Sequence, residues 1–276
     1  MQGKSMRMRG TEMCEGSARD IRLGCNPRIN FMNITIDVLT MDETVELTER
    51  YIRTGTPLHL VGVNADKVNQ LRDSRELRAL AEGCGIVNAD GASVVAASRF
   101  LGCPLPERVA GIDLMDRLVA LSAEKGYRVY LLGAEQSVVE EAGKRLREKY
   151  PPLILAGLRN GYFDDSDWPQ ISEQLADARP ELVFVGISSP KKEQLIAYLQ
   201  SQGHRCVFMG VGGSFDVIAQ RLKRAPVWIQ KLGLEWLFRC VQEPRRLFVR
   251  YFVGNGRFIL AVAREYFRKR RDDRES

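Results

Sequence analysis

The chain has 276 residues, of which 45% are hydrophobic and 28% charged, which suffices for one large or two small globular domains with a buried core. No apolar run reaches the ~18 residues that a membrane-spanning helix needs, and residues 1–30 lack the apolar segment typical of a secretory signal. The net charge of +6 is unevenly spread: residues 221–276 hold 15 Lys and Arg against 6 Asp and Glu, so they carry +9 and residues 1–220 carry −3. Such a basic segment indicates an anionic partner, which is a lipid surface, a pyrophosphate or a nucleic acid.

Cysteine and histidine usage argues against disulfides and His-based chemistry. The six cysteines show no C-x-x-C spacing, and four stand in apolar or helical contexts, which is typical of buried thiols in a reducing cytoplasm. The two histidines, His59 and His204, lie in a strand pattern and in a turn, so we expect neither a His-based metal site nor a catalytic triad. Residues 1–31 have almost no apolar periodicity, and we predict a disordered leader there, ahead of a functional start at Met32.

Predicted strands and helices alternate at short intervals from residue 34 to residue 222. The predicted strands are 34–39, 58–63, 85–87, 128–132, 153–156, 182–187 and 206–211. The predicted helices are 42–53, 66–81, 92–101, 112–125, 135–150, 168–178, 191–201 and 214–222. This alternation predicts an α/β domain over residues 32–224, with a Rossmann-like, mostly parallel sheet covered by helices on both faces.

The alternation stops at residue 225. Residues 225–271 have apolar residues at helical spacing with Arg and Lys between them, which predicts a basic, amphipathic helical appendage over residues 225–276. A nucleic-acid-binding helix, a solvated helix face and a helix lying on anionic lipid are three interpretations of this pattern. The acidic body and the lack of a helix-turn-helix motif disfavour nucleic acid, and the interleaved Trp and Phe disfavour a solvated face. We therefore favour a membrane surface, and the apolar residues would be covered either there or in a homo-oligomer.

An acidic residue follows the predicted strand 85–87. Asp90, in Asn88-Ala89-Asp90-Gly91, precedes the helix 92–101 and would face the carboxyl edge of the sheet, where open α/β folds bind ligands. A carboxylate also favours a helix N-terminus, so these four residues alone favour a helix cap over a functional role. Arg108, in the loop 103–111, is either a solvated surface charge or a bidentate clamp for a pyrophosphate.

Three predicted strands end in small-residue turns that could cradle a phosphate. They contain Gly133-Ala134, Gly186 and Gly212-Gly213, the last followed by Asp216. Glycine lets backbone N–H groups approach an anion, but none of the turns has dinucleotide or P-loop spacing. An ordinary strand-to-helix turn explains Gly133 well and Gly212-Gly213 less well, because adjacent glycines cost ordering entropy without packing anything.

Three aspartates resemble an Asp-x-Asp metal site for a nucleotide sugar. They are Asp164, Asp165 and Asp167. Because they precede the helix 168–178, capping and turn formation explain them as well, and we favour that interpretation over a metal site.

Seven stretches in a fixed order resemble the WecG/TagA/CpsF family of glycosyltransferases, and as a set they are highly specific. They are 88–91, 104–111, 131–134, 189–193, 209–216, 224–226 and 233–237. The resemblance implies an inverting, metal-independent transferase without a cofactor. It would move N-acetylmannosamine, its uronate or a hexose from a UDP-sugar to a polyprenyl-pyrophosphate-linked sugar, in cell-surface polysaccharide synthesis at the inner face of the plasma membrane.

The resemblance also implies roles for individual residues. Asp90 would be the general base, Arg108 would share its pocket, and the basic appendage would close the site and meet the lipid pyrophosphate. The residues expected to bind substrate are Asn64, Asn88, Gly91, Gly133, Ala134, Gly186, Lys192, Glu193, Gly212, Gly213 and Asp216. Those expected to contact the acceptor pyrophosphate or the membrane are Arg239, Arg245, Arg246 and Arg250.

Two departures from the family's pattern leave the donor sugar open. The family commonly has Thr where Gly62 stands and Gln where Lys192 stands, both near the expected donor. The alternative to an enzyme is a non-catalytic protein on the same fold that binds a nucleotide sugar and a membrane. An NAD-dependent dehydrogenase is disfavoured because the dinucleotide fingerprint is missing.

Overall fold

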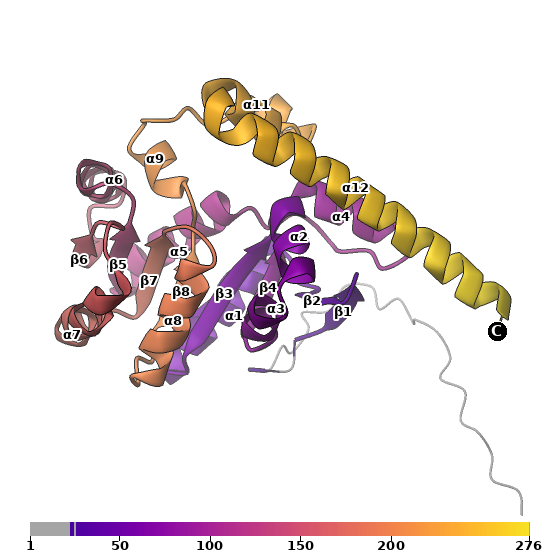
Figure 1. The fold of residues 1–276 in the computed structure, drawn as a ribbon. Coiled ribbons are helices and arrows are strands. Elements are labelled where there is room, and N and C mark those ends of the chain that lie inside the picture. Colours follow the sequence, from indigo (N-terminus) through magenta and orange to yellow (C-terminus); the bar gives the residue numbers. More distant parts are fainter. Residues whose placement is uncertain (1–22, 25, 276) are drawn as a thin grey trace, which may run out of the picture.

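The computed structural model describes residues 23–24 and 26–275, without the side chains of residues 245, 246, 248, 250 and 273–275. Its centre is a sheet of six parallel strands in the order β4-β3-β8-β7-β5-β6 (Figure 1). Their bounds are β3 (Leu58–Val63), β4 (Ile86–Ala89), β5 (Arg128–Gly133), β6 (Ile154–Arg159), β7 (Leu182–Gly186) and β8 (Val207–Gly210). This confirms the predicted parallel α/β architecture. All strands except the edge strand β6 are mostly buried, as expected for a parallel sheet that is covered on both faces.

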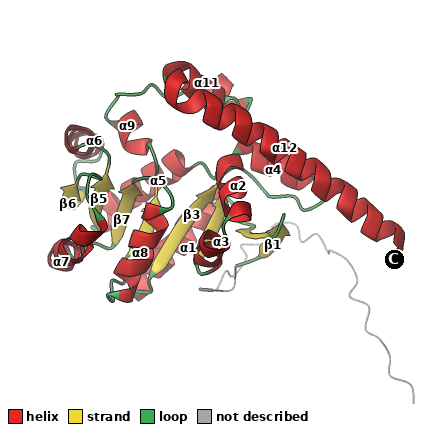
Figure 2. Cartoon of the chain, in the orientation of Figure 1, coloured by secondary structure: helices red, strands yellow, loops and turns green. Residues whose placement is uncertain are grey.

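Helices cover the sheet on both faces (Figure 2). The first face is covered by α1 (Met41–Thr54), α5 (Gly111–Lys125) and α6 (Gln136–Lys149). The second is covered by α2 (Ala65–Asp73), α3 (Arg75–Glu82), α7 (Trp168–Ala178) and α8 (Lys191–Ser201). Two further helices begin at the carboxyl edge of the sheet, α4 (Ala92–Phe100) after β4 and α9 (Ser214–Ile218) after β8.

Two predictions for the first hundred residues are corrected. The predicted helix 66–81 is two helices, because Ser74 is extended and its Oγ accepts from the backbone N–H of Leu77, which starts α3. The predicted leader 1–31 is too long at its end: β1 (Arg28–Phe31) forms an antiparallel hairpin with β2 (Ile34–Asp37), and Phe31 is fully buried. Residues 1–22 lie outside the described residues.

The segment after residue 224 is helical, as predicted. It forms α10 (Val227–Lys231), α11 (Glu235–Gln242) and α12 (Pro244–Glu275). The 32 residues of α12 span roughly 48 Å and cross the body above α2 and α4 (Figure 1). Phe258 and Ala261 are buried in the cluster that contains Val68 and Leu71 of α2, so α12 is docked on the body by its apolar side.

Candidate active site

The strand order brings five predicted site positions to one edge. Because all six strands are parallel, their carboxyl ends lie together, and the sequence β4-β3-β8-β7-β5 places Asp90, Asn64, the Gly212 turn, Gly186 and Gly133 along that edge in this order. This is the edge at which open α/β sheets bind ligands. We take it as the candidate active site.

Asp90 is half-buried between α4 and α5. Its side chain does not cap α4, because Gly91 holds the cap position and no side chain bonds there, so the interpretation of Asp90 as the cap of that helix is wrong. Instead its Oδ1 accepts from the backbone N–H of Gly111, the first residue of α5, at 2.8 Å. The backbone N–H of Asp90 donates to the carbonyl of Val63 at 2.9 Å, which ties the turn to β3. One carboxylate oxygen is therefore held by backbone.

Glycines allow Asp90 to take this position. A Cβ at Gly62 would lie 3.1 Å from the Cβ of Asp90 and 3.7 Å from its Oδ2, so a larger residue here would press on the carboxylate. A Cβ at Gly91 would lie 3.0 Å from the Cα and Cβ of Asn64. The departure from threonine at residue 62 thus falls directly beside Asp90.

Two predicted substrate ligands, Asn88 and Asn64, also hold the scaffold. Asn88 is 1% exposed, and its Nδ2 donates to the carbonyl of Val109 at 2.8 Å. Its amide nitrogen fixes the loop before α5, and its assignment as a substrate contact stays a prediction. Asn64 caps α2, since its Oδ1 accepts from the backbone N–H of Lys67 at 3.0 Å, but it is half-buried at the edge and remains a proposed substrate contact.

The turns after β5 and β7 are packed against each other. A Cβ at Gly133, whose φ is +140°, would lie 2.5 Å from the carbonyl of Gly186, and a Cβ at Gly186 would lie 2.6 Å from the ring of Phe215. The backbone N–H of Ala134 donates to the carbonyl of Gly186 at 3.2 Å. These contacts explain the small residues without a ligand, and they contradict a phosphate cradle that uses the N–H of Ala134.

The turn after β8 is open. A Cβ at Gly212, whose φ is +52°, would meet no atom within 4 Å. A Cβ at Gly213 would lie 3.4 Å from Nη2 of Arg239 and 3.5 Å from Oδ2 of Asp216. Gly212-Gly213 and Asp216 lie together as predicted, and Arg239 of α11 joins them, so this turn is the better candidate for a phosphate.

A buried charge cluster lies between the two halves of the edge. Lys67 donates to Glu193 at 2.5 Å and to Ser189 at 2.8 Å, and Lys192 lies 3.5 Å from the same glutamate oxygen. Burial by itself raises the pKa of Glu193, but the ammonium groups of Lys192 and Lys67 outweigh it and lower the pKa to about 2. Burial lowers the pKa of Lys192. Its side chain lies over Gly210 at the end of β8, where a Cβ would come within 2.8 Å of its Nζ.

Arg108 is held on two sides. Its Nε donates to the backbone carbonyl of Asp90 at 2.7 Å, and its Nη2 donates to Glu235 of α11 at 2.8 Å. The predicted proximity of Asp90 and Arg108 is confirmed. Of the four predicted appendage arginines, Arg239 donates to the carbonyl of Gly213 at 3.4 Å. The backbones of Arg245, Arg246 and Arg250 lie in the first two turns of α12, and their side chains lie outside the described residues.

The aspartates after residue 163 form a cap. Asp164 and Asp167 make a reciprocal capping box around the 3-10 turn η1 (Asp165–Asp167), in which Oδ2 of Asp167 accepts from the backbone N–H of Asp164 at 2.9 Å. Capping is confirmed for Asp164 and Asp167, and Asp165 lies in the turn itself, as the interpretation by capping and turn formation predicted. Among the described residues, no group of three or more His, Cys, Asp or Glu is placed to hold a metal ion.

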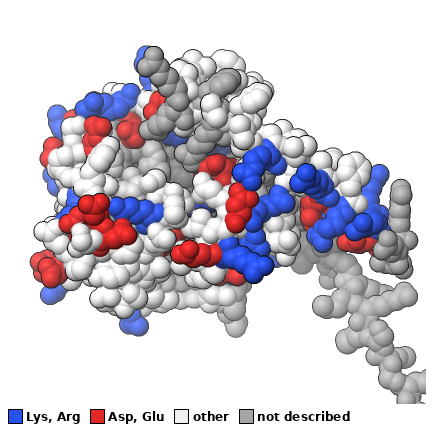
Figure 3. Space-filling model, viewed as in Figure 1, with Lys and Arg blue, Asp and Glu red and all other residues white. Residues whose placement is uncertain are grey.

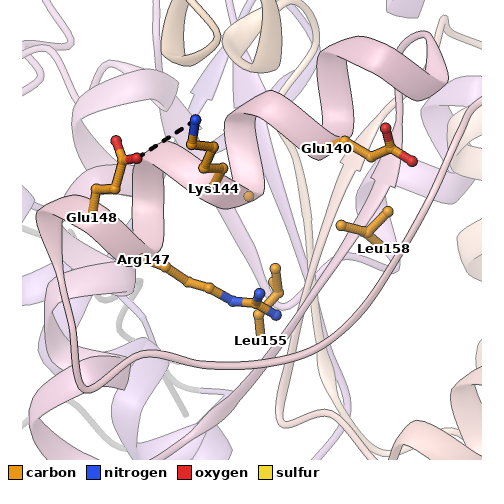
Figure 4. Close-up of a pocket in the computed structure, with 7 residues that line it drawn as sticks. Glu140, Lys144, Arg147, Glu148, Leu155 and Leu158 are labelled. Atoms are coloured by element: carbon orange, nitrogen blue, oxygen red, sulfur yellow. Dashed lines mark ion pairs between the residues drawn. The ribbon is translucent and has the colours of Figure 1, made fainter.

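Two cavities lie away from this edge. One of about 430 Å³ lies between α6 and the edge strand β6, where Arg147 extends toward Leu155 and Lys144 pairs with Glu148 at 3.9 Å (Figure 4). The other, of about 600 Å³, is lined by residues at the opposite edge of the sheet, including His204 and Cys206. Neither contains a predicted site residue, so neither changes the assignment.

Three residues that touch the site were not predicted from the sequence. Lys67 contacts the predicted residue Glu193, Glu235 contacts the predicted residue Arg108, and Ser189 accepts from Lys67. Lys67 and Glu193 are 126 residues apart, and Arg108 and Glu235 are 127 apart. Ser189 and Glu235 stand within two of the quoted motifs, which was the only signal available for them.

Comparisons with known proteins agree with this geometry. A family model described as the glycosyl transferase WecG/TagA/CpsF family matches residues 29–272. Proteins of Staphylococcus aureus strains MW2, COL and MRSA252 are each 32% identical over 222 residues, which cover 80% of this chain and 87% of the relative. Each of these relatives is named N-acetylglucosaminyldiphosphoundecaprenol N-acetyl-beta-D-mannosaminyltransferase.

Proposed function

The chain belongs to the WecG/TagA/CpsF family of glycosyl transferases, and we propose that it transfers N-acetylmannosamine from its UDP-sugar to a polyprenyl-pyrophosphate-linked N-acetylglucosamine. The names of the staphylococcal relatives supply both sugars. The observation that carries the proposal is the position of Asp90: a half-buried carboxylate at the carboxyl edge, fixed through Oδ1 and linked to Arg108 through its own backbone.

In the proposed reaction Asp90 is the general base. The Gly111 N–H holds Oδ1, and Oδ2 lies toward the space beside Gly62. Asp90 takes the proton from a hydroxyl of the acceptor sugar while the hydroxyl oxygen attacks the anomeric carbon from the face opposite UDP. The bond from the anomeric carbon to the phosphate oxygen breaks, UDP leaves with the electron pair, and the configuration is inverted. Such a base contributes about 10²–10⁴-fold to the rate.

The leaving UDP carries charge that cationic side chains must stabilise. Arg108 lies on the Asp90 side of the edge, Arg239 lies against the Gly213 turn, and the buried ammonium of Lys192 lies between them over β8. We assign charge stabilisation to these three residues. Asn64 and Asp216 are the proposed sugar and nucleotide contacts, and Arg245, Arg246 and Arg250 the proposed contacts to the acceptor pyrophosphate.

The appendage is the proposed membrane contact. Large apolar side chains are exposed along it, among them Val227, Trp228, Leu232, Phe252 and Phe267, each more than 60% exposed. Lys and Arg side chains gather over the part of α12 toward the C-terminus and over the adjoining body (Figure 3). Exposed aromatics beside a basic surface suit a helix lying in the headgroup region of an anionic bilayer. Among residues 23–24 and 26–275, no helix is long and apolar enough to cross the bilayer.

A UDP-release screen tests the proposed reaction. The purified protein is mixed with UDP-N-acetylmannosamine, its uronate or UDP-glucose, with and without a short polyprenyl-pyrophosphate N-acetylglucosamine. We expect UDP release with the first donor only when the acceptor is present, together with a lengthened lipid-linked product. Calorimetric binding of the UDP-sugar without any UDP release would select the alternative, a non-catalytic binding protein. Turnover with the uronate alone would keep the reaction class and correct the donor.

A further inference from the structure

The side chain of Arg108 is fixed by two different parts of the chain. The carbonyl of Asp90 accepts from Nε, and Glu235 accepts from Nη2 across 127 residues of sequence. The side chains of Arg108 and Glu235 are 26% and 18% exposed, so solvent only partly screens the ion pair. An arginine fork held at both ends keeps one orientation, whereas an arginine held at one end samples many rotamers.

Glu235 also belongs to the helix that reaches the other half of the site. It is the first residue of α11, and Arg239 follows one turn later on the same side of the helix. Arg239 contacts the carbonyl of Gly213, at the turn after β8. One short helix therefore spans the edge from the Asp90 side to the Gly213 side.

Two neighbouring contacts show that α11 lies close to the body at both ends. A Cβ at Gly233, whose φ is +72°, would lie 3.1 Å from the Cβ of Ala92, the first residue of α4. At the other end, Gln242 accepts from the backbone N–H of Lys223 at 2.8 Å and donates to its carbonyl at 2.9 Å. These contacts set where α11 lies, and Glu235 joins the helix to the side chain of Arg108.

We propose that Glu235 is a positioning residue, which orients the Arg108 guanidinium and sets α11 so that Arg239 meets the Gly213 turn. The inference rests on the proposed function, since it concerns how the same site holds an anionic diphosphate. In this arrangement the docking of α11 orients Arg108 beside Asp90 and places Arg239 at the Gly213 turn at the same time. A displacement of about 1 Å at a positioned group is enough to lower a rate by about 10²-fold.

The test compares Glu235→Ala with a control that removes a different contact of the appendage. Asp73→Asn removes the ion pair between Arg257 of α12 and Asp73 of α2, at 3.0 Å, which also joins the appendage to the body but lies away from the site. With both substrates saturating, we expect Glu235→Ala to lower kcat by about 10²-fold while Asp73→Asn stays within twofold of the wild type. Both variants should melt within a few degrees of each other.

Chemical rescue separates positioning from mere stability. Truncation to alanine removes a carboxylate beside Arg108, so added formate should restore part of the kcat of Glu235→Ala, and chloride at equal ionic strength should not. If Glu235→Ala does not fold, Glu235→Gln is tested in its place, because glutamine keeps the side-chain length and an acceptor oxygen but loses the charge. A tenfold or greater loss of kcat in Glu235→Gln supports the proposal. A kcat within twofold of the wild type, or above it, in the variant that folds overturns it.

Hydrogen exchange gives a readout that does not depend on turnover. Amide exchange in α11 should accelerate in Glu235→Ala and not in Asp73→Asn. If the wild type releases no UDP, the proposed function fails, and the exchange of α11 alone then decides the inference: unchanged exchange in Glu235→Ala overturns the role of Glu235 in placing the helix.

Discussion

Replacing Glu193 by glutamine should destabilise the protein more than any surface ion-pair substitution, because it leaves two buried ammonium groups without their shared carboxylate. The side chain of Glu193 is 4% exposed and that of Lys67 is 8% exposed, with 2.5 Å between their charged atoms. Removing one partner of a buried pair costs about 3–5 kcal/mol. Lowering the pKa of Glu193 from 4.5 to about 2 corresponds to about 3 kcal/mol, which agrees. A loss of about 3 kcal/mol should lower the melting temperature of a chain of this length by roughly 6–12 °C.

The stabilisation by Glu193 depends on pH in a direction set by its lowered pKa. Because the pKa of Glu193 in the folded protein lies below its ordinary value of 4.5, its stabilisation is complete above pH 4.5 and is lost as the pH falls toward 2. The difference in unfolding free energy between the wild type and Glu193→Gln should therefore be largest at pH 7 and should shrink below pH 4.5. Urea unfolding at pH 7, 5 and 3 measures it.

A matched control uses an exposed pair. Glu148→Gln removes a partner of Lys144 at 3.9 Å, where both side chains are more than 60% exposed, and should change stability by less than about 0.5 kcal/mol at every pH. The reasoning is refuted if Glu193→Gln costs less than about 1 kcal/mol at pH 7, or if its cost is the same at pH 7 and pH 3.

Two further predictions concern the appendage. Phe258→Ala should lower the free energy of unfolding by about 3–5 kcal/mol and speed amide exchange in α12, because Phe258 is 4% exposed in the cluster shared with α2. The control Phe267→Ala, at a position 69% exposed, should change both little, and equal effects of the two variants would contradict docking through the Phe258 side of the helix. The double variant Trp228→Glu/Phe252→Glu should bind vesicles of phosphatidylglycerol at least about tenfold more weakly in a flotation assay, since each aromatic buried in the bilayer contributes about 1.5–3 kcal/mol. Tyr162→Ser, which changes an exposed aromatic outside the appendage, should leave vesicle binding unchanged. Loss of a concentration-dependent oligomer in the double variant, with vesicle binding intact, would assign the apolar surface to a second copy of the chain instead.

The elements with strong local signals were predictable from the sequence. β3, α7 and α8 have the bounds that were expected, because each is a periodic run between clear breaks. The split at Ser74 was missed because the apolar spacing continues across it, and only the extended backbone at Ser74 shows that its hydroxyl begins a second helix. The strand β1 was missed because four residues before a tight turn carry little pattern of their own.

The site was predictable in its position but not in its contacts. The end of a strand gives Asp90 its place at the edge, whereas its partner Gly111 depends on how α5 returns to the sheet. Gly133 and Gly186 were predicted as phosphate-binding turns because glycine lets an anion approach the backbone. Glycine also allows close packing, and only the structure shows that a Cβ at either residue would clash with a neighbour. Glu235 joins Arg108 through a helix that folds back over the sheet, which no local pattern specifies.

The general base is tested most directly by the turnover of Asp90→Asn. Asparagine keeps an acceptor oxygen for the Gly111 N–H, so the fold of this turn should persist while the ability to take a proton is lost. With UDP-N-acetylmannosamine and the lipid-linked acceptor saturating, kcat should fall by about 10²–10⁴-fold. The control Asp116→Asn, which removes an exposed ion pair between Asp116 of α5 and Lys149 of α6, should retain wild-type kcat. Near-wild-type turnover by a correctly folded Asp90→Asn would contradict the assignment of Asp90 as the base.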